Sequence, residues 1–200
     1  MKTQRFFQIG LVLALSLLAL PTIVLSQSSS WFHRQPPENW NQLGATIPKA
    51  PHSNSMNVER CQQQIRNPST PEEQAVRAAG WMLYKVRNTT SSLSGISLVE
   101  GLTDFDGMCR PIGYQEFVFV NGIFAGTTSP VIMDARSDGA LFETKIEGPS
   151  RLTSQFARYA KRDALCCPSK TSEVTYQIDF KNNKPLLVPL KIRTYANPHQ

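Results

Sequence analysis

The sequence predicts an α+β fold, in which one or two helices pack on an antiparallel β-sheet that is stapled by disulfide bonds. Three observations predict this class. A capped amphipathic helix begins near Pro71, a β-hairpin is centred on Asn121-Gly122, and an alternating strand pattern starts at Val174. Strands joined by short turns pair antiparallel, and a helix with one apolar face must bury that face against another element.

The helix signal lies in the first half of the chain. Thr70 is the expected N-cap, Pro71 occupies the first turn, and Glu73 completes a T-x-x-E capping box. Apolar residues then recur at helical spacing as far as residue 86, and they predict one face that packs on the sheet: Ala75, Val76, Ala79, Met82, Leu83 and Val86. A glycosylation sequon at residues 88–90 indicates a surface loop after the helix.

The hairpin lies within residues 106–130, which form the central stretch of the chain. Residues 117–120 and 123–125 are apolar, and Asn121-Gly122 between them suits a type I′ turn with two positive φ angles. Four apolar residues without alternation predict a strand that is covered on both faces. The residues after it are either plain core or a candidate ligand-facing loop: Gly126, Thr127, Thr128 and Ser129.

Further strands are predicted over residues 93–98, 141–146, 174–180 and 187–195. Residues 152–159 fit either another strand or a short helix. Asp138-Gly139 and residues 181–184 are typical of turns. Pro189 cannot donate a ladder hydrogen bond, so the last strand is expected at a sheet edge.

Acidic residues cluster before the hairpin at Glu100, Asp104 and Asp106. Carboxylates at short spacing are typical of calcium ligands, but the full EF-hand pattern is missing. The cluster is therefore interpreted as a polar turn with Asx-type hydrogen bonds. No metal site and no cofactor are predicted.

The N-terminal region predicts export. Lys2 and Arg5 precede an apolar run, and a V-x-S pattern before Gln27 is typical of a signal peptidase site, so residues 1–26 are predicted to be a signal peptide. The alternative is an uncleaved membrane anchor. Residues 27–57 are rich in Ser, Pro and Asn and are interpreted as a linker. Its aromatic residues are either anchors or loosely ordered: Trp31, Phe32 and Trp40. Residues 58–200 are predicted to form a single domain.

The four cysteines of an exported chain predict disulfide bonds: Cys61, Cys109, Cys166 and Cys167. Adjacent Cα atoms lie about 3.8 Å apart, below the usual disulfide range, so a bond between Cys166 and Cys167 is disfavoured. We therefore expect two long-range bridges, in which Cys166 and Cys167 each pair with Cys61 or Cys109. A bond between the two neighbours would instead favour redox chemistry.

Charge limits the classes of partner. The formal net charge is +6, and +4 once Lys2 and Arg5 are removed with the signal peptide. The charges are scattered, without the basic stripe and interleaved aromatic residues of a nucleic-acid-binding protein. A mixed, solvated surface is predicted, and nucleic acid is excluded as a partner. Contact with a membrane is expected only through an uncleaved signal, and the partner is an envelope component or another exported protein.

Four stretches of the chain carry a family resemblance: residues 78–84 (AAGWMLY), 106–130 (DGMCRPIGYQEFVFVNGIFAGTTSP), 137–141 (SDGAL) and 158–176 (RYAKRDALCCPSKTSEVTY). With these stretches the chain resembles the LppP/LprE lipoprotein family, in the form found among cyanobacterial exported proteins. The resemblance implies an exported envelope protein and supplies no catalytic or ligand-binding residues. The family is named for lipid attachment, but no cysteine stands at the predicted cleavage site, so lipidation is not expected.

No catalytic motif is present in the sequence. The three histidines lie in polar segments, at His33, His52 and His199, so a Ser-His or Cys-His pair within the domain is not expected. The leading hypothesis is a non-enzymatic exported protein that binds an unknown ligand or the cell envelope. One alternative is a thiol–disulfide protein that uses Cys166-Cys167. The other is a hydrolase of envelope polymers that uses carboxylates such as Asp104 and Asp106.

Overall fold

The structure is a computed structural model that describes residues 30–53, 57–85 and 95–198. The predicted signal peptide, the sequon and Val86 lie outside these ranges. Helices are short: the 3-10 helices η1 Ser30–His33 and η2 Gln62–Gln64, and the α-helices α1 Asn57–Arg60 and α2 Pro71–Ala78. Neither α-helix has the length and apolar character needed to span a bilayer, within the described ranges.

Strands are the predominant secondary structure of the described chain, and they form three antiparallel sheets. The first has the order β1-β2-β3-β6-β7, with β1 Ile65–Arg66, β2 Met82–Tyr84, β3 Ile96–Leu102, β6 Gln115–Val120 and β7 Ile123–Thr127. The second has the order β11-β10-β9-β8, with β8 Leu141–Gly148, β9 Arg151–Arg158, β10 Lys170–Lys181 and β11 Lys184–Ala196. The small third sheet pairs β4 Asp104–Phe105 with β5 Pro111–Ile112.

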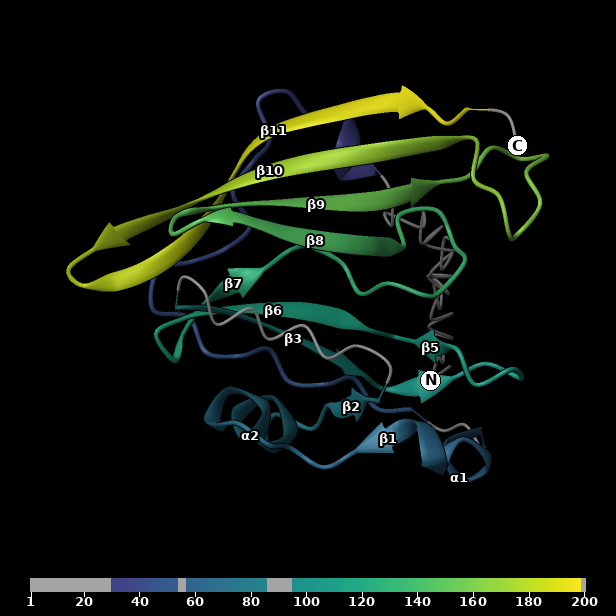
Figure 1. Cartoon of the computed structure of the whole chain (residues 1–200), viewed down its shortest axis with the longest axis horizontal. Coiled ribbons are helices and arrows are strands. Elements are labelled where there is room, and N and C mark those ends of the chain that lie inside the picture. The colour runs from purple at the N-terminus through teal and green to yellow at the C-terminus, as the bar shows by residue number, and fades with distance from the viewer. Residues whose placement is uncertain (1–29, 54–56, 86–94, 199–200) are drawn as a thin grey trace, which may run out of the picture.

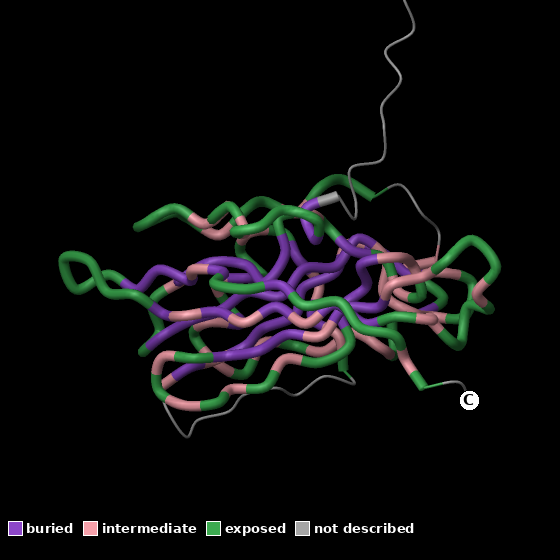
Figure 2. The backbone as a smooth tube through the Cα atoms, turned by 90° about the horizontal axis from the view of Figure 1, so that it is seen from above, coloured by how far each residue is buried: buried purple, intermediate pink, exposed green. Residues whose placement is uncertain are grey.

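The layers follow from the burial pattern of the first sheet. In Figure 1 the four-stranded sheet lies on one side of the five-stranded sheet and α2 on the other. Val118 and Val120 of β6 face the core between the two sheets, together with Phe156 and Tyr176. Phe117 of β6 faces a second cluster beneath α2. The predicted strand with two covered faces is therefore confirmed, and buried backbone runs through the middle of the molecule (Figure 2).

The predicted α+β class is confirmed only in part, because the fold is predominantly β and its helices are short. Thr70 caps α2 as predicted, since its Oγ1 accepts a hydrogen bond from Glu73 N at 3.3 Å. The helix then ends at Ala78 rather than continuing to residue 86, because Gly80 adopts a φ of +96° that an α-helix cannot accommodate. The residues that follow form β2, which pairs with β1 and β3.

The hairpin predictions are confirmed. Asn121 and Gly122 have φ of +48° and +80°, as a type I′ turn requires, and β6 pairs with β7 across them. Asn182 and Asn183 turn β10 into β11 in the same way, with φ of +50° and +60°. Residues 152–159, which fit a strand or a helix, lie mainly in strand β9. Pro189 lies on β11, an edge strand of its sheet, as predicted.

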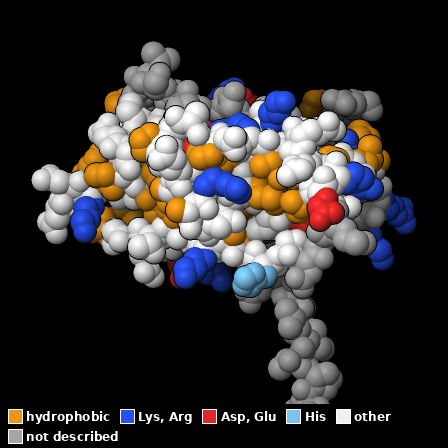
Figure 3. Space-filling view, turned by 90° about the horizontal axis from the view of Figure 1, so that it is seen from below, with side chains coloured by type: hydrophobic (Ala, Val, Ile, Leu, Met, Phe, Trp, Pro, Cys, Tyr) orange, Lys and Arg blue, Asp and Glu red, His pale blue; other side chains and the backbone are white. Residues whose placement is uncertain are grey.

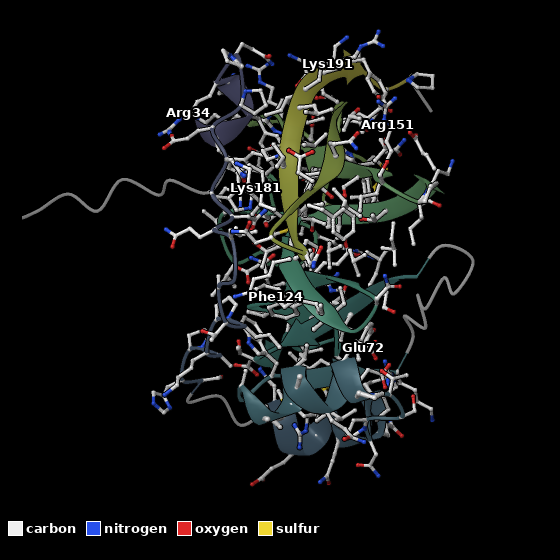
Figure 4. The ribbon with its side chains drawn as sticks, turned by 90° about the vertical axis from the view of Figure 1, so that its left-hand side faces the viewer. Arg34, Glu72, Phe124, Arg151, Lys181 and Lys191 are labelled. Carbon is white, nitrogen blue, oxygen red and sulfur yellow. A yellow bond between two sulfur atoms is a disulfide. The ribbon has the colours of Figure 1, made fainter. Side chains whose placement is uncertain are left out.

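The segment interpreted as a linker packs on the domain. Trp31 and Phe32 are buried in the core between the sheets, and their rings contact Phe156 at centroid distances of 5.4 and 5.3 Å. Arg158 lies over the Phe32 ring at 4.5 Å. Trp31 and Phe32 therefore anchor this segment on the domain, while most other residues of 33–53 are exposed. The segment runs alongside both sheets in Figure 4.

Asn41 joins the two large sheets at their edges. Its Nδ2 donates to the carbonyl oxygens of Thr127 on β7 and Leu187 on β11, each at 3.1 Å. Its Oδ1 accepts from Thr127 N at 2.9 Å. The side-chain amide of Asn41 thus makes hydrogen bonds to the backbone of both edge strands, as the backbone of a strand lying between them would. Gly126 permits this approach, because a Cβ there would lie 2.4 Å from the Asn41 side chain.

Changing Asn41→Asp is expected to lower the free energy of unfolding by about 2 kcal/mol, because it replaces the donor with an oxygen that faces two carbonyl oxygens. Urea unfolding at pH 7 measures the change. Asn39→Asp is the matched control, since Asn39 Oδ1 only accepts a hydrogen bond, from Asn41 N at 3.0 Å, and aspartate keeps that acceptor. Equal effects of the two substitutions would contradict the bridging role of the Asn41 amide.

Candidate functional site

A cleft of about 370 Å³ lies between β7 and the N-terminal segment, by which we mean residues 30–53. We call it the Trp40 cleft. Its apolar surface comes from both sides: Trp40, Pro48, Trp81, Phe124, Pro130 and Ile132. Its polar lining consists mainly of amides and hydroxyls: Asn41, Gln42, Thr46, Gln115 and Thr127. Figure 4 shows Phe124 on β7, beside the N-terminal segment.

Most polar groups of the Trp40 cleft are engaged by the protein itself. Trp40 Nε1 donates to Thr127 O at 3.0 Å, and Trp81 Nε1 donates to Pro48 O at 2.7 Å. Gln115 Nε2 donates to Ser129 O at 2.9 Å. Among the residues that the structure describes, Lys49 is the one charged residue in the lining of this cleft. The described lining therefore offers mainly rings and aliphatic surface to a ligand, together with the cation of Lys49.

The candidate loop after the hairpin divides between this cleft and the core. Gly126 and Thr127 line the cleft. Thr128 and Ser129 are buried, and Ser129 Oγ donates to Val131 O at 2.8 Å. Buried Tyr176 donates from its hydroxyl to Thr128 O, and burial raises the pKa of Tyr176 well above its usual value. All four residues are buried, and of them only Gly126 and Thr127 also line the cleft.

The cysteines pair differently from our expectation. Cys61 is bonded to Cys109, with Cα atoms 5.4 Å apart, and Cys166 is bonded to Cys167. Arg60 Nη2 donates to Gly107 O at 2.9 Å, so the two ends of the first bridge are held together. The expected cross-pairing assumed an extended segment with sulfurs on opposite faces. The segment instead bends, because Cys167 N donates to Ala164 O at 2.9 Å.

Of the three acidic residues that were predicted to form a polar turn, only Asp106 does so, whereas Glu100 lies in β3 and Asp104 in β4. Asp106 Oδ1 accepts from the backbone N–H groups of Met108 at 2.8 Å and Arg110 at 2.9 Å. Burial raises the pKa of Asp106, but these hydrogen bonds and the Arg110 guanidinium outweigh it and leave the pKa below its usual value. Asp104 Oδ2 accepts from Ser53 Oγ at 2.6 Å. Within the described ranges, no group of three His, Cys, Asp or Glu side chains is arranged to hold a metal ion.

Surface charge agrees with the mixed pattern predicted from the sequence. In Figure 3 the Lys and Arg side chains lie scattered among apolar and polar ones over the face that is shown, without a continuous basic stripe. Exposed apolar side chains occur on several elements, among them Ile123, Ile132, Phe142 and Leu165. Phe142 and Leu165 both line a cleft beside Cys166.

Fold and site together define a disulfide-bonded, predominantly antiparallel β-protein with a mainly apolar cleft between its N-terminal segment and β7. A family model described as LppP/LprE lipoprotein matches residues 88–180, which confirms the resemblance seen in the sequence. The match includes β3 to β9 and most of β10, and it leaves out α2, β11 and the N-terminal segment. It supports an exported, envelope-associated location. No curated protein and no solved structure matches the chain.

Sequence reasoning missed most of the Trp40 cleft. It singled out Gly126 and Thr127 but assigned Trp40 and its neighbours to a linker. The available signal was the pair of tryptophans and the phenylalanine in an otherwise polar segment. Three large aromatic residues within ten positions are unusual for a solvated tail, because burying each of them stabilises a fold by several kcal/mol, on the order of 3–5.

Proposed function

We propose that this chain is an exported, envelope-associated and non-enzymatic binding protein whose ligand lies in the Trp40 cleft. The composition of the cleft lining carries the proposal. Rings and aliphatic groups meet there, while the amide and indole N–H groups already donate to backbone carbonyls. Binding sites for small ligands are concave and predominantly apolar, with a few polar groups that fix orientation.

The chemistry of the lining favours an amphiphile over a highly charged ligand. Trp40 and Phe124 offer ring surface, and Ile132 adds aliphatic surface. Lys49 provides one positive charge, which suits a single carboxylate or sulfonate at one end of the ligand. A nucleotide or a polyphosphate would require several cations or backbone N–H groups directed at it, and this cleft has one lysine.

Titration with 8-anilinonaphthalene-1-sulfonate, an apolar probe with one negative charge, tests the proposal. Ile132 is 43 % exposed and lines the cleft, whereas Ile123 is 48 % exposed on the hairpin outside the lining. We expect Ile132→Glu to weaken binding of the probe about tenfold, because it places a carboxylate beside the sulfonate and removes apolar contact. Ile123→Glu is expected to leave binding unchanged.

The readout is fluorescence of the bound probe, with the melting temperature of each variant as a check on folding. Lys49→Gln should weaken binding of the probe less than Ile132→Glu does. The difference in affinity between these two variants should narrow at high salt. Equal binding to both isoleucine variants would place the probe elsewhere. Absence of probe binding to the unaltered chain would refute the amphiphile assignment.

A further inference from the structure

The loop that joins β9 to β10 carries a disulfide bond in a setting unlike that of the other bridge. It projects at one end of the four-stranded sheet, near the C-terminus (Figure 1). Cys166 and Cys167 are both exposed, whereas Cys61 of the Cys61–Cys109 bridge is fully buried. Disulfide exchange requires a thiolate to reach a sulfur atom, so access favours the Cys166–Cys167 bond.

Hydrogen bonds fix this loop independently of the sulfur atoms. Asp163 Oδ2 accepts from Ala160 N at 2.7 Å and from Ser169 N at 2.8 Å. Tyr159 donates from its hydroxyl to Leu165 O at 2.9 Å. At the C-terminal end of the loop, Asn197 Nδ2 donates to Pro168 O at 2.7 Å. Reduction of the bond would leave these contacts in place, so the loop can keep its shape in both redox states.

The bond also does little to stabilise the chain. A disulfide stabilises mainly by restricting the unfolded state, and the effect grows with the length of chain that it closes. Cys61 and Cys109 are 48 residues apart, whereas Cys166 and Cys167 are neighbours. Structural stabilisation therefore accounts for the first bridge and not for the second, which points to a chemical role for the exposed pair.

Two clefts give access to Cys166. One, of about 580 Å³, is lined by Phe142, Arg162 and both cysteines. The other, of about 320 Å³, is lined by Phe142, Leu165 and Cys166 together with Arg136, and Glu100 lies in the same lining. Neither shares a residue with the Trp40 cleft. The exposed apolar side chains of Phe142 and Leu165 offer a partner a surface to contact beside the sulfurs.

We propose that Cys166–Cys167 is a thiol–disulfide exchange site that accepts two electrons from a reduced protein dithiol. A thiolate of the dithiol attacks one sulfur, forms a mixed disulfide, breaks the Cys166–Cys167 bond and releases the other cysteine as a thiolate, which takes up a proton. The second thiol of the partner then loses its proton and attacks the partner's sulfur of the mixed disulfide, which breaks the mixed bond and releases the remaining chain cysteine as a thiolate that takes up a proton. The partner leaves oxidised, with one disulfide, and the chain holds two thiols.

Timed reduction of the exported chain tests this assignment. The chain is treated with dithiothreitol, and in parallel with reduced thioredoxin as a model protein dithiol, then alkylated and mapped by peptide mass spectrometry. We expect Cys166 and Cys167 to become alkylated at least tenfold faster than Cys61 and Cys109. The melting temperature should stay unchanged during this fast phase, and oxidised glutathione should restore the bond once dithiothreitol has been removed.

A Cys166→Ser/Cys167→Ser variant is the matched control and should lose only the fast phase. Alkylation of Cys61 and Cys109 first, unfolding that accompanies reduction of the loop pair, or failure of the pair to re-form would each overturn the exchange role. A thioredoxin reaction slower than that of dithiothreitol at equal concentration would overturn the preference for a protein partner. Probe binding in the Trp40 cleft is measured separately, so the two proposals fail independently.

Discussion

Replacing Cys61 and Cys109 together with alanine is expected to lower the free energy of unfolding by about 4 kcal/mol. The two residues are 48 apart in sequence, and closing a loop of that length restricts the unfolded chain by about this amount. Cys61 precedes η2, while Cys109 lies in the turn between β4 and β5. The bridge therefore ties the small third sheet to the segment that leads into β1. Urea unfolding of the oxidised proteins at pH 7 measures the loss.

The matched comparison is the Cys166→Ala/Cys167→Ala variant, which removes a bond that closes almost no chain. Its expected loss is about 1 kcal/mol or less. Reducing agent should abolish the difference between the unaltered chain and the Cys61→Ala/Cys109→Ala variant once the buried bridge has been reduced. Similar losses for the two double variants would contradict the division of the bridges into one that stabilises the fold and one that does not.

Sequence patterns that span only a few residues predicted the corresponding secondary structure well. Asn121-Gly122 specifies a turn because both residues tolerate positive φ, and the flanking apolar runs form the hairpin strands. Thr70 and Pro71 specify the start of α2 for an equally local reason. The end of that helix was not predicted, because Met82 and Leu83 fit a helical face as well as a strand. Their pairing with β3 decides between the two, and that pairing is not visible in a local pattern.

The other differences between the predicted and the observed structure arise from contacts between residues that are far apart in the sequence. Disulfide pairing depends on which loops the fold brings together, and the Cys61 and Cys109 segments meet through contacts such as that of Arg60 with Gly107. The place of Asn41 between β7 and β11 is likewise set by two strands far away in the sequence. Part of the Trp40 cleft was predictable from the hairpin, but its other wall depends on where the N-terminal segment packs.

Changing Glu73→Gln is expected to lower the free energy of unfolding by about 3 kcal/mol at pH 7. Glu73 is only 4 % exposed at the start of α2. Its Oε1 accepts from Arg66 Nη2 of β1 at 2.7 Å, and its Oε2 accepts from Ser69 N at 2.7 Å and Ser69 Oγ at 2.8 Å. The Arg66 hydrogen bond is the largest influence on the carboxyl, and although burial opposes it, the pKa falls from 4.5 to about 2.

The pH dependence identifies the charge as the cause. A carboxyl whose pKa is lowered by folding stabilises the folded chain above its unfolded pKa, and this contribution is lost as the pH falls through the folded pKa. The difference between the unaltered chain and Glu73→Gln should therefore be full above pH 5 and shrink steadily to near zero by about pH 2. Urea unfolding at a series of pH values measures this difference.

Glu72→Gln is the matched control, because it removes the same charge from the same helical turn (Figure 4). It should lower the free energy of unfolding by about 0.5 kcal/mol, the usual size of a helix-dipole interaction. A loss at Glu73 that stays constant down to pH 2 would instead assign the effect to the shape of the side chain, and the link between α2 and β1 would then not depend on an ion pair.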